Sequence, residues 1–270
     1  MTRVERDVVY ATVLGFRPLA LDLHLPETAS ADAPVPVIVF VHGGGWRRGS
    51  RSTMVPNVDS SQSFDRIVAA GFCLASIDYR LSGEAHFPAQ LDDLRAALEW
   101  VRAEGRAHGL DASRIVLWGE SAGATIASLV ALEPAAAVRG VIDWYGPADL
   151  IAFARLSDPA ELASTRESEW LGTTALAEPD LARRASPALQ VATTPPPFLI
   201  AHGTADTLVP FEQSELLAEA LRAAGGDVGF TAVPGADHMW RGVDDVAPIF
   251  AQAIAFAVAR TNEKADSHAS

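Results

Sequence analysis

The sequence is poor in cysteine, and it contains no long apolar segment. Its single cysteine, Cys73, excludes an internal disulfide framework and a metal site built from several cysteines. Cys73 lies in the apolar run 71–77, where we expect a small buried hydrophobic residue rather than a reactive thiol. No uninterrupted apolar stretch approaches the roughly 20 residues that a membrane-spanning helix requires.

Basic residues are also scarce, because 21 lysines and arginines stand against 34 acidic residues and give a formal net charge of −13. A chain this acidic repels the phosphates of nucleic acids and of anionic membranes. We therefore expect no nucleic-acid partner and no stable membrane insertion. The first residues, 1–7, lack the basic start and apolar stretch of a secretory signal, which predicts a cytoplasmic protein.

Apolar residues, in contrast, are abundant. Hydrophobic residues make up 49% of the 270 positions, which is enough to bury a sizeable core in one large α/β domain or in two small ones. Two alternating segments, 8–14 and 19–25, predict an antiparallel pair of strands at the start. Continuous apolar runs, typical of strands covered on both faces of a parallel sheet, follow at 36–41, 72–77, 114–118, 140–144, 197–201 and 228–233.

Helical patterns separate these runs. Apolar residues recur at helical spacing over 88–101, 217–224 and 246–257. Strands that alternate with helices predict a doubly wound parallel sheet of the α/β class, in a single domain over residues 1–260. Residues 147–195 contain short helical pieces but no convincing strand, which indicates a helical insertion of the kind that often forms a lid. Residues 261–270 are expected to form a polar tail.

The segment Gly119-Glu120-Ser121-Ala122-Gly123 matches the pattern G-x-S-x-G. It follows the predicted strand 114–118 and precedes a helix-compatible stretch, which is the setting that a nucleophile elbow requires. In such a turn the two glycines allow the chain to reverse sharply, so that the serine is held exposed at the top of the sheet. Ser121 is therefore the predicted nucleophile.

A glycine block, His42-Gly43-Gly44-Gly45-Trp46, directly follows the predicted strand 36–41. Because glycines leave the backbone N–H groups unshielded, such a loop can direct them at the oxyanion that develops during acyl transfer. We expect the N–H groups of Gly44, Gly45 and Ala122 to form this oxyanion hole. A flexible glycine loop without a role is the alternative interpretation.

Two further loops supply an acid and a base in the chain order Ser…Asp…His. Asp206 follows the predicted strand 197–201, and His238 follows the predicted strand 228–233. Both loops leave the carboxyl ends of parallel strands, so their side chains are expected to meet Ser121 at one edge of the sheet. His238 would accept the proton of Ser121, and a buried Asp206 would orient the imidazole and stabilise its charged form.

Three other aspartates compete with Asp206 for the role of the acid. Asp237 adjoins His238, but neighbours in sequence rarely meet at the correct ring nitrogen. Asp143 and Asp149 lie near the end of an earlier strand, from which either could also supply the carboxylate. Asp206 is preferred because it stands in the expected chain order on a loop that leaves the sheet.

Other polar residues near strand ends have structural interpretations. Asp78 is expected to be a structural acid that pairs with Arg80, and His42 and His202 are expected to support loops through hydrogen bonds. The sequence contains no H-E-x-x-H, no paired-histidine metal spacing and no phosphate-binding G-x-x-x-x-G-K. We therefore predict hydrolysis without a metal or another cofactor.

Three motifs together resemble the bacterial carboxylesterases of the α/β-hydrolase superfamily: the block 42–46, the stretch 78–89 and the elbow 119–124. The chain is similar to the hormone-sensitive-lipase-like group, and more similar still to its feruloyl-esterase-like and acetylxylan-esterase-like relatives. The resemblance extends from about residue 8 to residue 259. It implies the α/β-hydrolase fold with a mostly parallel, eight-stranded sheet, ester hydrolysis through an acyl-enzyme, and the oxyanion donors named above.

Two departures from the hormone-sensitive-lipase-like pattern favour the smaller relatives. Only 41 residues precede His42, and two predicted strands take up much of that length, so a large N-terminal cap is not expected. The elbow has Glu120 before the serine, where that group more often has aspartate or threonine.

These observations predict a serine carboxylesterase that acts on a small-molecule ester with a short-chain or aromatic acyl group. Trp46, Glu120 and Trp170 are expected to contact the substrate, with packing in the core as an equally good role for Trp170. Hydrolysis of an amide-like bond, as in an arylformamidase, is one alternative, and a non-catalytic binding protein with a hydrolase fold is another. The oligomeric state stays open, and a homodimer is compatible with the sequence.

Overall fold

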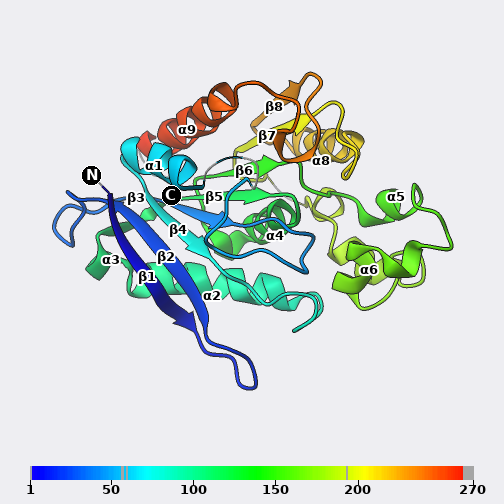
Figure 1. Ribbon diagram of the computed structural model, residues 1–270, viewed down its shortest axis with the longest axis horizontal. Coiled ribbons are helices and arrows are strands. Elements are labelled where there is room, and N and C mark those ends of the chain that lie inside the picture. The colour runs from blue at the N-terminus through cyan, green and yellow to red at the C-terminus, as the bar shows by residue number, and fades with distance from the viewer. Residues whose placement is uncertain (1, 56–57, 59, 193, 264–270) are drawn as a thin grey trace, which may run out of the picture.

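The strands of the computed structural model, which describes residues 2–55, 58, 60–192 and 194–263, lie in one sheet (Figure 1). Their order across this eight-stranded sheet is β1-β2-β4-β3-β5-β6-β7-β8. The strands are β1 (Thr2–Ala11), β2 (Leu19–Pro26), β3 (Val35–Val41), β4 (Cys73–Ile77), β5 (Leu110–Glu120), β6 (Gly140–Trp144), β7 (Phe198–Gly203) and β8 (Val228–Val233).

The direction of the strands divides the sheet into two parts. β2 runs antiparallel to both β1 and β4, whereas β3 to β8 pair in parallel with their neighbours. The α/β-hydrolase sheet predicted from the sequence is therefore confirmed. β1 begins six residues earlier than predicted, because Thr2 to Glu5 pair with the last residues of β2 although they lack an apolar alternation.

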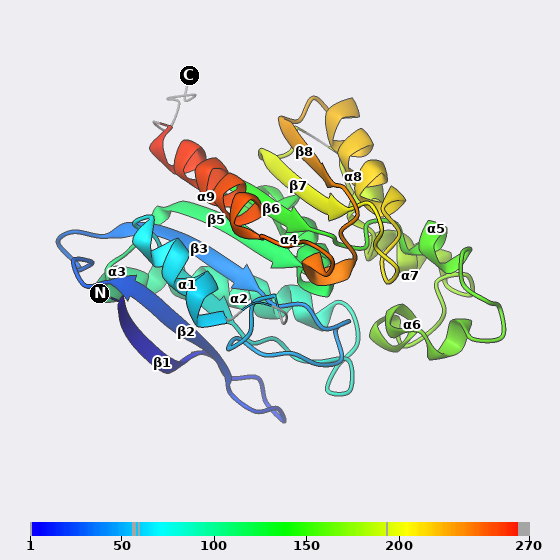
Figure 2. The ribbon, with the colours of Figure 1, turned by 45° about the horizontal axis from the view of Figure 1, so that its top comes forward.

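Helices cover both faces of this sheet (Figure 2). Apolar side chains of α2, α4 and α8 pack in one core with one face, and those of α1 and α9 pack in a second core with the other face. The helices are α1 (Ser60–Ala69), α2 (Ala89–Ala103), α3 (Gly105–His108), α4 (Ala122–Ala131), α5 (Leu150–Ala154), α6 (Arg166–Leu171), α7 (Pro179–Arg184), α8 (Glu212–Ala223) and α9 (Ala247–Asn262).

The continuous apolar run of β3 is explained by these two cores. Val37, Val39 and Val41 point into the core beneath α2 and α4, while Ile38 and Phe40 point into the core beneath α1 and α9. Successive side chains of a strand face opposite sides of the sheet. A strand covered on both sides therefore needs apolar residues at every position.

The segment 147–195 contains α5, α6 and α7 and, among its described residues, no strand. Figure 2 shows α5, α6 and α7 beyond the ends of β5, β6 and β7, on the side to which these strands point. The predicted tail, 261–270, overlaps the end of α9 at Thr261 and Asn262, and its residues 264–270 lie outside the described residues. Among the described residues, no helix combines the length and the apolar character needed to cross a bilayer.

The predicted pairing of Asp78 with Arg80 is wrong. Asp78 forms salt bridges with Arg51 and, at 3.8 Å, with Arg17, whereas the Nη2 atom of Arg80 lies 2.6 Å from Oδ1 of Asp93. Asp93 lies on α2 and is almost fully buried, whereas Asp78 is less buried. An unpaired charge costs more free energy at the more buried position, so the pairing of Arg80 with Asp93 is the more stabilising one. Sequence proximity alone could not identify this partner.

Candidate active site

The turn at Ser121 joins β5 to α4 through a strained backbone conformation, with φ 53° and ψ −124°. The flanking glycines are required by close contacts. A Cβ atom on Gly123 would lie 2.1 Å from the carbonyl oxygen of Val41, and one on Gly119 would lie 2.5 Å from the backbone of Ala124. The strand-turn-helix setting predicted for Ser121 is therefore present, and no larger residue fits at either glycine.

His238 lies within hydrogen-bond distance of both Ser121 and Asp206. Its Nε2 atom is 3.0 Å from Oγ of Ser121, and its Nδ1 atom is 2.6 Å from Oδ2 of Asp206. The side chains of Asp206 and His238 are 0% and 5% exposed. Because an ionised carboxylate only accepts, Nδ1 carries the hydrogen and Nε2 of the neutral ring is free to accept from the serine hydroxyl.

Four donors surround the carboxylate of Asp206. The backbone N–H groups of Leu208 and Val209 donate to Oδ1 at 2.8 Å, and His202 and His238 contact Oδ2. Burial alone would raise the pKa of Asp206, but the hydrogen bonds from His202 and His238 outweigh it and hold the pKa below its ordinary value. The carboxylate is thus kept ionised beside the imidazole.

None of the three competing aspartates forms a hydrogen bond with the imidazole ring of His238 in the described structure. Asp237 accepts from the backbone of the loop after β7 and pairs with a surface arginine. Asp143 accepts from the hydroxyl of Ser128, and Asp149 caps the N-terminus of α5. Each of these carboxylates therefore has a structural role, and Asp206 is the acid that the fold brings to the histidine.

The glycine block begins a loop beside Ser121. Burial lowers the pKa of His42 to about 4, so its ring is neutral, and its Nδ1 atom lies 2.7 Å from the carbonyl oxygen of Gly43. Among the described residues, the N–H groups of Gly44, Gly45 and Ala122 donate no hydrogen bond within the chain. Three unused donors beside one serine are what the oxyanion of a tetrahedral intermediate requires.

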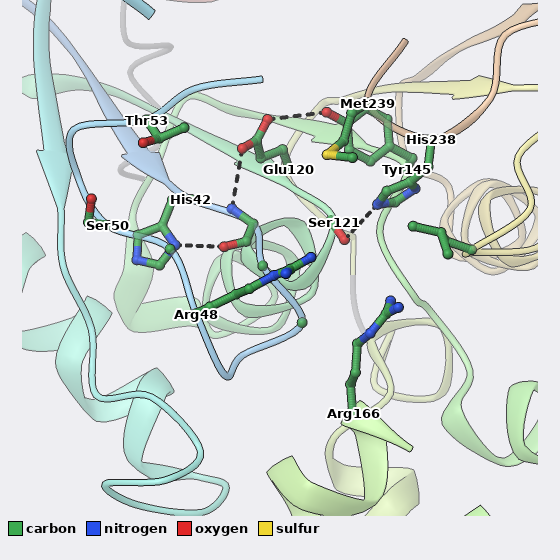
Figure 3. A pocket seen from close by; sticks show the side chains of 15 residues that line it. His42, Arg48, Ser50, Thr53, Glu120, Ser121, Tyr145, Arg166, His238 and Met239 are labelled. Carbon is green, nitrogen blue, oxygen red and sulfur yellow. Dashed lines mark hydrogen bonds between the residues drawn. The ribbon is translucent and has the colours of Figure 1, made fainter. Parts of the chain in front are cut away.

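Glu120 connects this loop to the rest of the site (Figure 3). Its Oε1 atom accepts from the N–H of Gly43 at 3.4 Å, and its Oε2 atom accepts from the N–H of Val55 at 3.0 Å and from the hydroxyl of Tyr145 at 3.1 Å. Burial raises the pKa of Glu120 to about 7, although these three hydrogen bonds oppose the effect. Glu120 lines the cavity and holds the start of the glycine block.

A cavity of about 580 Å³ opens onto Ser121. Its volume lies in the range usual for sites that bind small molecules. Within the described ranges, no group of three or more His, Cys, Asp or Glu side chains is arranged to hold a metal ion. The walls of the cavity come from the glycine block and the loop after it, the elbow, and single residues of later loops: His42–Gly45, Arg48–Ser50, Thr53, Glu120, Ser121, Tyr145, Arg166, Leu208, His238 and Met239.

Trp46 and Trp170, predicted to contact the substrate, do not line this cavity. Their rings stack on each other with centroids 4.4 Å apart, and both are almost completely buried. Phe87 packs edge-on against Trp170, and the indole N–H of Trp170 donates to Gln90 at 2.8 Å. The substrate prediction is therefore corrected for both residues, because their burial leaves the rings no surface for a ligand. Trp170 instead packs in the core, which is the alternative role predicted for it.

Several residues that line the cavity were not predicted from the sequence, among them Arg48, Tyr145 and Arg166. Tyr145 directly follows the predicted strand 140–144, a position that could have marked it as an edge residue. Its ring lies 4.7 Å from that of His238. Arg166 had no comparable signal, because the path of an irregular insertion cannot be read from apolar spacing.

Comparison with known proteins gives one family match, to the BD-FAE family, over residues 21–221. Esterase LipC of Mycobacterium tuberculosis is 33% identical over 221 residues, which cover 76% of this chain and 53% of LipC. The chain spans about half the length of the curated relatives it matches.

Solved structures are similar over nearly the whole chain. A truncated form of a carbohydrate esterase from gut microbiota has a TM-score of 0.84 at 27% identity, with 97% of each chain covered. Thermogutta terrifontis esterase 2 phosphorylated by paraoxon has a TM-score of 0.75 at 26% identity, with 97% of this chain and 96% of that chain covered.

Proposed function

Because this chain belongs to the BD-FAE family, we propose that it is a serine carboxylesterase that hydrolyses short-chain or aromatic esters through an acyl-enzyme. The family match and the esterase relatives confirm the resemblance to α/β-hydrolase carboxylesterases expected from the motifs. The observation that supports the proposed activity most is the contact of His238 with both Ser121 and Asp206.

In the acylation step, Oγ of Ser121 attacks the ester carbonyl carbon while Nε2 of His238 takes the hydroxyl proton. The carbonyl oxygen becomes an oxyanion that accepts from the N–H groups of Gly44, Gly45 and Ala122. The tetrahedral intermediate then expels the alkoxide, which receives the proton from His238 and leaves as the alcohol. Asp206 stabilises the imidazolium between these two transfers.

Deacylation repeats these reaction steps with water in place of the serine hydroxyl. Nε2 of His238 removes a proton from water, and the resulting hydroxide attacks the acyl carbon bound to Ser121. The second intermediate releases the carboxylic acid, and the proton returns from His238 to Oγ. Glu120 acts in both steps by holding Gly43 and thereby the donors that follow it.

The arrangement around this chemistry is part of the same proposal. One catalytic domain spans residues 1–260, and the insertion 147–195 contributes Arg166 to the wall of the cavity, as a partial lid would. A small-molecule ester is the only partner required. A cytoplasmic location, which the sequence predicts, is tested by cell fractionation.

An activity screen tests the proposed function. Rates on p-nitrophenyl esters of increasing acyl length, on a feruloyl ester and on an acetylated sugar are compared with the rate on N-formylkynurenine. We expect the highest kcat/KM on a short-chain or aromatic ester. Turnover of N-formylkynurenine above that of every ester would favour the arylformamidase alternative, and no turnover together with no labelling by a fluorophosphonate would favour a binding protein.

A further inference from the structure

Two arginines, Arg48 and Arg166, line the cavity that opens onto Ser121. Arg48 follows the glycine block, and Arg166 is the first residue of α6 in the insertion. In Figure 3 both side chains extend towards Ser121, on the side away from the carboxyl group of Glu120. The cavity therefore has two positive side chains in its wall near the proposed nucleophile.

Contacts with the glycine block hold both arginines in place. A Cβ atom on Gly45 would lie 2.4 Å from Cδ of Arg166, so the aliphatic part of that side chain rests on the bare backbone of Gly45. A Cβ atom on Gly44 would lie 3.2 Å from Cγ of Arg48. Since these two glycines belong to the proposed oxyanion hole, the aliphatic parts of both arginine side chains lie beside the position proposed for the scissile carbonyl.

No acid in the described part of the chain neutralises the two groups, because neither arginine forms a salt bridge or a side-chain hydrogen bond there. Arg47, the neighbour of Arg48, instead pairs with Glu169 at 3.3 Å outside the cavity. Burial raises the pKa of Glu167, and the charge of Arg166 opposes this in part, but in the described structure no salt bridge joins the side chains of these two residues.

Glu120, the one carboxyl group among the described residues of the cavity wall, is also not a partner for the arginines. Both of its oxygens accept hydrogen bonds from Gly43, Val55 and Tyr145. Arg48 is exposed and Arg166 is half-buried. Because both are positively charged and line the same cavity, an anion bound in it would be attracted to both. Guanidinium groups match carboxylates in shape, because two parallel N–H donors meet two oxygens.

We propose that the preferred substrate of this site is an ester that also carries a carboxylate, on its acyl or on its alcohol part, a few bonds from the scissile carbonyl. The inference rests on the proposed ester hydrolysis. It assigns Arg48 and Arg166 to the binding of that carboxylate. The acidic surface of the chain repels anions at long range, so discrimination comes from contacts inside the cavity.

Matched pairs of esters test this assignment. Monoethyl glutarate and ethyl glutaramate differ only in a carboxylate and a carboxamide on the acyl part, and O-acetylglycolate and O-acetylglycolamide differ in the same way on the alcohol part. In one pair at least, we expect the acid to exceed the amide in kcat/KM by roughly tenfold or more, as for hydrogen bonds to a charged group. This ratio should fall at high salt, and the pair that shows it identifies the part that carries the charge.

Variants show whether the arginines cause the preference. Arg48→Gln and Arg166→Gln should each lower the acid-to-amide ratio several-fold, and Arg166→Lys, which keeps the charge, should retain most of it. Arg47→Gln is the matched control, because it removes the same charge one residue away from Arg48 and outside the cavity. It should leave the ratio unchanged.

The outcomes separate this inference from the proposed function. Equal kcat/KM for acid and amide in both pairs, or a preference for the amides, would overturn the inference while the esterase activity stands. A preference for the acids that Arg47→Gln reduces as much as Arg48→Gln does would also overturn it. Failure to hydrolyse any ester, p-nitrophenyl acetate included, would overturn the proposed function and this inference together.

Discussion

The Nε2 atom of His202 lies 3.2 Å from the Oδ2 atom of Asp206, the same oxygen that His238 contacts from the other side. Nε2 of His202 also lies 3.0 Å from the carbonyl oxygen of Val209. A carbonyl only accepts, so this nitrogen carries the hydrogen, and Nδ1 lies 2.7 Å from the hydroxyl oxygen of Ser214. His202 is therefore held in place as a donor that orients Asp206.

His202→Phe should lower kcat by about tenfold and leave KM nearly unchanged, because Asp206 loses one donor and its orientation. His202→Gln, which keeps an N–H donor, should recover part of this loss. Steady-state kinetics on one neutral ester measure both variants. Equal kcat values for the Phe and Gln variants would show that the hydrogen bond to Asp206 has no role in catalysis.

Asp206→Asn should lower kcat by roughly 10⁴, because the amide favours the wrong tautomer of His238. Asp237→Asn is the matched control. Asp237 receives hydrogen bonds from Thr207 and Arg241 and does not reach the ring of His238 in the described structure, so its replacement should change kcat far less. Comparable losses in the two variants would contradict the assignment of the acid.

Glu120→Gln should lower kcat on all esters by roughly tenfold or more, because its amide cannot accept from both Val55 and Gly43. The N–H of Gly43 then faces a donor or loses its partner, and the donors of Gly44 and Gly45 shift with it. Steady-state kinetics on two neutral esters measure this loss. A normal kcat in a folded Glu120→Gln variant would show that the loop holds its position without this contact.

The same substitution should change the pH dependence of stability. Burial raises the pKa of Glu120 from 4.5 to about 7, so the folded chain retains a proton that the unfolded chain has released between these values. Its contribution to the free energy of unfolding therefore falls as the pH rises through this window, by up to roughly 3 kcal/mol. Urea denaturation should show a smaller fall for Glu120→Gln than for the wild type, and parallel pH profiles would contradict the raised pKa.

Trp170→Ala should reduce the free energy of unfolding by about 3–5 kcal/mol, because it removes a fully buried ring that stacks on Trp46. Since Trp170 does not line the cavity, kcat/KM should change by a similar factor for an acetate and for a feruloyl ester. Thermal melting and kinetics on the two esters provide the test. A change in kcat/KM for only one of the two esters, without a fall in Tm, would show that Trp170 contacts the substrate.

The sequence carried enough information to predict the sheet and the three candidate catalytic residues. Ser121 directly follows a strand, Asp206 and His238 lie on the loops that follow two other strands, and the carboxyl ends of parallel strands meet at one edge. The positions of these residues after their strands therefore predicted that their side chains meet, although they are far apart in the sequence. Trp46 lies on a loop, and Trp170 lies on the six-residue helix α6, which is too short to show an apolar periodicity, so their mutual stacking could not be predicted.

The same limit applies to the pairing of charges. Arg80 meets Asp93 rather than Asp78 because of the path of the loop before α2, which apolar patterns do not determine. Arg48 and Arg166 are far apart in the sequence, and they share one cavity because the insertion brings the start of α6 against Gly45. Such relationships depend on packing between loops and become visible in the structure.

Covalent labelling of Ser121 tests the proposed serine esterase most directly. The wild-type chain is treated with a fluorophosphonate, and the modified peptide is identified by mass spectrometry, with Ser121→Ala as the control. We predict one label per chain on Ser121, no label in Ser121→Ala, and a loss of turnover in that variant on the order of 10⁴- to 10⁶-fold. An unlabelled wild type, or a Ser121→Ala variant that keeps its label and its turnover, would contradict the account.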